Sequence, residues 1–122
     1  MNVFDASALL CFLQGESGAD VVEERLLDGD SYCGAANWSE IAQKLIAAGR
    51  DWELARALLS SYGLDVAPVT AHDAEWAARR WRRGQGLSLA DRLCMALGAR
   101  LQADVWTADA SWGDAEGVRQ IR

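Results

Sequence analysis

The chain has 122 residues, of which 51% are hydrophobic and 25% are charged, a balance typical of one soluble globular domain. No apolar run approaches the roughly 18 residues that span a bilayer, and the first residues lack the basic and apolar regions of a signal peptide. We therefore expect a cytoplasmic protein without a membrane segment. The net charge of −6 argues against polyanion binding by the whole surface, so nucleic acid would have to contact a local basic patch.

The apolar pattern alternates between strand-like and helix-like segments along the chain. Short apolar runs predict β-strands at residues 2–5, 31–36, 64–69, 104–107 and near 117–121. Apolar residues at spacings of three and four predict helices at residues 6–14, 18–28, 37–48, 51–62, 71–83 and 88–101. This alternation is typical of an α/β fold with a parallel sheet flanked by helices, and we expect a single domain over residues 1–122.

Several residue types are too rare to support other common chemistries. Cys11, Cys33 and Cys94 are widely spaced without a CxxC pair, so we interpret them as buried thiols and not as disulfides or zinc ligands. His72, the only histidine, falls in the first turn of a predicted helix, where a solvated side chain is expected. The sequence contains no glycine-rich phosphate loop. Carboxylates remain the abundant reactive group.

Four acidic residues fall where a parallel sheet binds ligands. Asp5 ends the first strand, Asp109 follows the fourth, and Glu40 and Asp91 lie in first turns of predicted helices. Because the carboxyl ends of strands and the amino ends of helices meet at one edge of the sheet, we expect these carboxylates to converge. Converging carboxylates repel each other unless one is protonated or a cation binds. Mg²⁺ prefers a few carboxylates with water, and such sites typically serve phosphate chemistry.

Helix capping is a competing interpretation for acids at the starts of helices. Capping boxes, in which a polar N-cap residue and an acid three positions later exchange hydrogen bonds, are predicted at residues 17–20, 37–40, 70–73 and 88–91. Asp5 has no evident capping role, and Asp109 is also compatible with a plain turn residue. Individually, the acids at the helix starts favour capping, whereas their shared edge favours a metal site.

Around these acids the sequence resembles the PIN-domain nucleases, particularly the VapC toxins of bacterial toxin–antitoxin pairs. The matching segments are residues 3–10, 37–41, 87–91 and 105–109. The resemblance implies a three-layer α/β/α sandwich with a central parallel sheet, and Mg²⁺ or Mn²⁺ held by Asp5, Glu40, Asp91 and Asp109. It also implies endonucleolytic cleavage of RNA, homodimerisation and inhibition by a cognate antitoxin.

Residues beside the acids add detail to the resemblance. Ser7 and Thr107 are plausible hydroxyl donors next to the carboxylates. Arg92 departs from the pattern, because a small or apolar residue is commoner after the acid at this place. Arg92 has two alternative roles: it changes the electrostatics of the site, or it contacts the substrate.

Two other functions are compatible with some of these features. Phosphoryl transfer to an aspartate uses acids at the same sheet edge, but it expects a lysine late in the chain, whereas Lys44, the only lysine, directly follows the second strand. The main alternative is a catalytically inactive PIN-fold module that binds RNA or a partner protein. The presence of all four acids argues against that alternative.

The segment Arg79–Arg83, which contains four arginines and Trp81, is the best candidate for RNA contact. Arginines pair with phosphates, and an exposed aromatic ring stacks on a base. We favour the alternative interpretation, in which the arginines form a solvated helix face and Trp81 turns toward the core.

Overall fold

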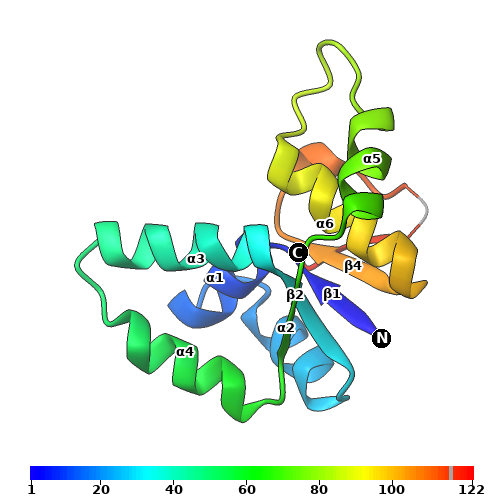
Figure 1. The fold of residues 1–122 in the computed structure, drawn as a ribbon. Coiled ribbons are helices and arrows are strands. Elements are labelled where there is room, and N and C mark those ends of the chain that lie inside the picture. The colour runs from blue at the N-terminus through cyan, green and yellow to red at the C-terminus, as the bar shows by residue number, and fades with distance from the viewer. Residues whose placement is uncertain (116) are drawn as a thin grey trace.

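The computed structural model describes residues 1–115 and 117–122, and it places a parallel five-stranded sheet between two layers of helices (Figure 1). The strand order is β3-β2-β1-β4-β5, and every neighbouring pair is parallel. This is the three-layer α/β/α arrangement expected from the sequence. Within the described ranges, no helix combines the length and apolar character needed to cross a bilayer.

Every strand and helix predicted from the sequence is present. The strands are β1 (Asn2–Phe4), β2 (Ser31–Gly34), β3 (Asp65–Ala67), β4 (Asp104–Thr107) and β5 (Val118–Gln120). The helices are α1 (Ala6–Gln14), α2 (Ala19–Leu27), α3 (Ala35–Ala47), α4 (Trp52–Ser61), α5 (Ala71–Arg79) and α6 (Leu89–Leu101), and a 3₁₀ turn, η1 (Ala110–Trp112), follows β4. The largest difference from the prediction is the end of α5, at Arg79 and not at residue 83. The start of α3, at Ala35, is also earlier than predicted.

The central strand β1 separates two hydrophobic cores. Phe4 packs in the core formed with α1, α2 and α3, whereas Val3 packs in the core formed with α6, β4 and β5. Both side chains are completely buried. Successive side chains of a strand point to opposite faces of the sheet, so a strand covered on both faces must be apolar at every position. Val3 and Phe4 of β1 meet this requirement, and Asp5 follows them directly.

Two of the four predicted capping boxes form. Thr70 with Asp73 caps α5, and Ser88 with Asp91 caps α6, each through both reciprocal hydrogen bonds. The box predicted around Gly18 is wrong, because Gly18 is itself the N-cap of α2 and offers no side-chain oxygen.

The capping box predicted at the start of α3 is also wrong. Gly34 is the N-cap in an extended conformation, and the helix begins at Ala35. Alanine is the strongest helix former, so residues 35–36 extend the helix toward the strand. Asn37 therefore lies inside the helix, on the face that also carries the buried residues Ile41 and Leu45.

Helices α5 and α6 are joined by two arginines of α6. The Arg100 guanidinium pairs with the buried Asp73 carboxylate at 3.0 and 3.2 Å. Burial raises the pKa of Asp73, but hydrogen bonds from Arg100 and Thr70 outweigh burial and hold the pKa below its usual value. Arg92 Nη1 donates to the Ala77 carbonyl at 2.8 Å. Arg92 therefore ties the first turn of α6 to the end of α5.

Helix α6 approaches the sheet closely at Gly98. A Cβ atom added there would overlap the Val105 side chain of β4. We expect Gly98→Ala to lower the free energy of unfolding by about 1–3 kcal/mol through overpacking, although alanine is intrinsically better than glycine in a helix. Denaturant unfolding measures this change. Adding Val105→Ala to Gly98→Ala should recover part of the loss, and a single variant as stable as the parent would show that the close approach is wrong.

Candidate active site

Asp5 directly follows β1 at the carboxyl edge of the sheet. Its backbone N–H donates to the Trp106 carbonyl at 3.1 Å, so the pairing of β1 with β4 extends to this residue. Its side chain is buried, and Oδ1 accepts the Ala8 N–H at 2.8 Å, which caps α1. The prediction that Asp5 has no capping role is therefore wrong. Sheet pairing and capping together hold the carboxylate in place.

Two hydroxyl groups donate to the Asp5 carboxylate. Ser7 Oγ lies 2.7 Å from Oδ1 and 2.9 Å from Oδ2, and Thr107 Oγ1 lies 2.6 Å from Oδ2. Each hydroxyl oxygen also accepts a backbone N–H, Ser7 from Ala108 at 2.9 Å and Thr107 from Asp109 at 3.0 Å. Because each hydroxyl oxygen accepts from the backbone, its own O–H group is free to donate to the Asp5 carboxylate. Ser7 and Thr107 thus act as donors next to a site acid, as expected from the sequence.

The environment of Asp5 opposes its negative charge. Burial raises the pKa of Asp5 to about 6, although hydrogen bonds from Thr107, Ala8 and Ser7 lower it, and the charge of Asp91 raises it further. No lysine, arginine or histidine in the described ranges forms an ion pair with Asp5. At neutral pH the site therefore holds a buried anion that has hydrogen-bond donors but no counter-charge, the situation in which a cation binds favourably.

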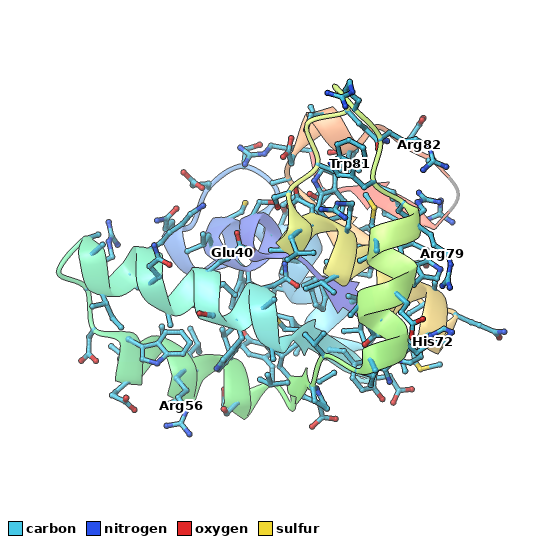
Figure 2. The ribbon with its side chains drawn as sticks, turned by 45° about the horizontal axis from the view of Figure 1, so that its top comes forward. Glu40, Arg56, His72, Arg79, Trp81 and Arg82 are labelled. Atoms are coloured by element: carbon cyan, nitrogen blue, oxygen red, sulfur yellow. The ribbon has the colours of Figure 1, made fainter. Side chains whose placement is uncertain are left out.

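Glu40 and Asp91 belong to neighbouring helices that share a polar contact. Glu40 lies in α3 (Figure 2), but beyond its first turn, so the prediction that placed Glu40 in the first turn is wrong because the helix begins at Ala35. Glu40 accepts a hydrogen bond from Asn37 Nδ2 at 3.2 Å. Asn37 Nδ2 also donates to the Ala90 carbonyl at 3.3 Å, in the first turn of α6. Asp91 follows Ala90, and its Oδ2 accepts the Ser88 N–H at 3.0 Å. Asn37 thus links the helix that carries Glu40 to the helix that carries Asp91.

Three of the predicted acids act electrostatically on one buried thiol. Burial raises the pKa of Cys94 well above its usual value, and the charges of Asp5, Asp91 and Glu40 raise it further. The Cys94 side chain is completely buried, in the same core as Val3. The structure therefore brings Asp5, Asp91 and Glu40 within electrostatic range of a single point.

Asp109 lies at the same edge but directs its carboxylate elsewhere. Its Oδ1 accepts from Ser111 N at 2.9 Å and from Ser111 Oγ at 2.6 Å, which caps η1. Its connection to Asp5 runs through its backbone N–H, which donates to Thr107. The turn interpretation of Asp109 therefore describes its present contacts, and its role as a ligand stays a prediction.

The acids do not yet form a closed set of metal ligands. Within residues 1–115 and 117–122, no three acidic, histidine or cysteine side chains are placed together so that they could hold a metal ion. Like charges that face each other without a cation repel. Glu40, Asp91 and Asp109 each accept a hydrogen bond from a protein donor in their own segment of the chain. Metal binding by the four acids stays a prediction.

Asn37 is the site residue whose role the sequence interpretation missed. It was assigned to the helix cap, but it is 1% exposed and bridges two helices. Its spacing of four and eight residues from Ile41 and Leu45 was the available signal, because it places a polar side chain on a buried helix face. The other assignments are confirmed: the cysteines are free and buried, and His72 is exposed in the first turn of α5.

The pKa of Asp5 predicts a pH-dependent stability of the metal-free protein. The folded-state pKa of about 6 exceeds the ordinary value of 3.8, so between these values the folded state binds a proton that the unfolded state has released. Stability from this group is therefore lost as the pH rises from about 4 to about 6. Relative to Asp5→Asn, which cannot titrate but still caps a helix, the parent should lose at most about 3 kcal/mol over this range.

Urea unfolding in the presence of a chelator, at a series of pH values, measures this difference. Subtracting the Asp5→Asn curve removes the contributions of the other acids. Parallel curves for the two proteins would contradict the raised pKa.

The sequence and the fold both match known proteins. The PIN-domain family model matches residues 3–117. A VapC ribonuclease of Mycobacterium bovis and ribonuclease VapC42 of Mycobacterium tuberculosis are each 35% identical over 106 residues, which cover 78% of this chain and 80% of the relative. A solved chain from a toxin–antitoxin complex of Klebsiella pneumoniae shares the fold with a TM-score of 0.79 at 16% identity, covering 100% of this chain and 98% of that one. The chain belongs to the PIN-domain family.

Proposed function

We propose that the protein is a Mg²⁺- or Mn²⁺-dependent endoribonuclease that hydrolyses RNA phosphodiester bonds, and that it is the toxin of a toxin–antitoxin pair. The observation that carries this proposal is the buried Asp5 carboxylate, which has no basic partner in the described ranges and is repelled by the charge of Asp91. The ribonuclease names of the mycobacterial relatives support RNA as the substrate.

The donor atoms of the site suit a hard divalent cation. In the described part of the chain, Oδ1 of Asp91 and Oε2 of Glu40 accept no hydrogen bond. The Ser7 hydroxyl is shared between both oxygens of Asp5, so the carboxylate keeps accepting capacity beyond its dedicated donors. Carboxylate oxygens with water are the ligands that Mg²⁺ and Mn²⁺ prefer. Asp5, Glu40 and Asp91 would hold the ion, and Asp109 is the fourth proposed ligand.

The residues of the chain prepare the site for hydrolysis. A bound divalent ion would supply an activated water and neutralise charge on the phosphodiester. Ser7 and Thr107 hold the Asp5 carboxylate toward the site by hydrogen bonds that favour its ionised form. Below about pH 6 the Asp5 carboxyl carries a proton, which competes with the cation. Activity should therefore decline as the pH falls below this value.

The proposed partners follow from the relatives and from the charge of the site. One solved structure with this fold comes from a toxin–antitoxin complex, and the sequence relatives are named VapC. We propose that a cognate antitoxin inhibits this chain and that the toxin is a homodimer. The acidic edge would attract an antitoxin segment that carries arginines. The competing proposal is an inactive PIN-fold module, and the cleavage experiment decides between them.

The purified chain should cleave single-stranded RNA when Mg²⁺ or Mn²⁺ is added. Asp5→Asn and Asp91→Asn should each reduce the rate by about two orders of magnitude or more, a loss typical of groups that act on the transition state. Gel analysis of a labelled RNA measures the rate. Expression of the parent alone should also arrest growth, and the same substitutions should relieve the arrest. An inactive parent in both metals would favour the binding module.

A matched pair of helix-start variants separates capping from metal binding. Asp91 and Asp73 occupy the same position in two capping boxes, but Asp73 pairs with Arg100 and not with the site. In chelator, Asp91→Asn should change stability by less than about 1 kcal/mol, because lost dipole stabilisation opposes relieved repulsion from Asp5. Asp73→Asn should lose about 1–3 kcal/mol, because Arg100 loses a charged partner.

Excess Mg²⁺ should then stabilise the Asp73→Asn variant as much as the parent, but it should not stabilise the Asp91→Asn variant. Denaturant melts with chelator and with Mg²⁺ measure both increments. An Asp91→Asn protein that keeps the parent's full Mg²⁺ increment would restrict Asp91 to capping.

A further inference from the structure

Trp81 lies on the surface and not in the core. Trp81 is 52% exposed, so the prediction that it turns toward the core is wrong. The reason is that α5 ends at Arg79, and the following residues no longer continue the helical face that packs against the core. Figure 2 shows Trp81 and Arg82 in the segment that stands out beyond the end of α5. Trp81 belongs to neither hydrophobic core, and its exposed surface is available for a ligand.

The first two arginines of the segment have partners on α5. Arg79 forms a long ion pair with Glu75 at 3.7 Å, in which both side chains are largely exposed. Arg80 stacks on Trp76 at 5.0 Å from the ring centroid. Among the described residues, the pair with Glu75 is the only ion pair that any arginine of Arg79–Arg83 forms.

The last two arginines are arranged around Trp81. Arg82 Nη1 donates to the carbonyls of Arg79 at 2.8 Å and Trp81 at 2.9 Å, which closes the end of α5. The Arg83 guanidinium lies over the Trp81 ring at 5.9 Å from its centroid. An aromatic face and guanidinium groups without carboxylate partners therefore occur together on the surface. This combination matches the base and the phosphate of a nucleotide.

The loop of residues 80–88 connects α5 to α6, and both of its ends are anchored next to the candidate active site. The loop rises from the end of α5 and returns to Ser88, which caps the helix that carries Asp91 (Figure 1). Arg92, the neighbour of Asp91, donates to the Ala77 carbonyl on α5. A strand of RNA that contacts the loop is therefore in position to reach the acidic edge.

We propose, on the basis of the proposed ribonuclease function, that Trp81, Arg82 and Arg83 form the surface that binds single-stranded RNA. Trp81 stacks on an unpaired base, and the two arginines contact the flanking phosphates. The segment Arg79–Arg83 holds four of the twelve lysines and arginines of a chain with a net charge of −6. It therefore supplies the local basic patch that RNA binding requires. An acidic protein partner would contact the arginines, but its binding would not require the exposed ring of Trp81.

Binding is measured with a labelled single-stranded RNA of mixed sequence, by fluorescence anisotropy in chelator so that no cleavage occurs. Trp81→Ala should weaken binding about tenfold, whereas Trp81→Phe should keep most of the affinity, because stacking needs an aromatic face. Arg83→Ala should reduce the slope of log affinity against log salt by about 0.7. Arg56→Ala is the matched control, since Arg56 is an exposed arginine on α4, away from the loop (Figure 2).

An abasic RNA of the same length tests the stacking directly. The parent should lose its advantage over Trp81→Ala on this probe, while the Arg83→Ala effect should remain. If the parent cleaves RNA with metal but Trp81→Ala binds as tightly as the parent, this proposal is overturned and the proposed function stands. If Trp81→Ala binds weakly but the parent cleaves nothing, the RNA surface stands and the nuclease proposal fails. A parent that does not bind RNA overturns both.

Discussion

The hydrogen-bonded burial of the Asp5 carboxylate is the interaction on which the rest of the site depends. Its donors come from two elements: the Ala8 N–H and the Ser7 hydroxyl at the start of α1, and the Thr107 hydroxyl at the end of β4. Burying a carboxylate is costly unless donors replace its water, and these donors replace it only when β1, α1 and β4 are all in place. The geometry of the proposed reaction centre therefore depends on the correct packing of the central sheet and α1.

The capping and metal interpretations of the acids are compatible. Asp91 completes a capping box and also contributes to the field at Asp5. A capping contact uses one oxygen of a carboxylate and leaves the other free, and the amino end of a helix favours negative charge. An acid at the start of a helix can therefore serve as a metal ligand and still have a hydrogen-bond partner, a backbone N–H, when the ion is absent. The present contacts of Asp109, which caps η1, illustrate the same arrangement.

The sequence was sufficient to predict the layers, the strands and the sheet edge at which Asp5 and Asp109 follow their strands, because these depend on apolar periodicity and on the geometry of parallel sheets. The local polar contacts were harder to predict. Asn37 resembles a cap in sequence, but two alanines extend the helix past it. Trp81 continues the apolar spacing of α5, yet the helix stops before reaching it. Helix ends depend on small differences in free energy between local conformers. The periodicity of apolar residues gives no information about these differences.

The packing of β1 between two cores couples the position of Asp5 to correct strand pairing. Val3 and Phe4 occupy different cores, so a shift of one residue in strand pairing would exchange their faces and drive Asp5 into an apolar layer. Such a chain would lose its fold before it could present a displaced carboxylate. An error in the pairing of β1 therefore disrupts the fold and the reaction centre together. It does not produce a well-folded molecule in which only Asp5 is misplaced.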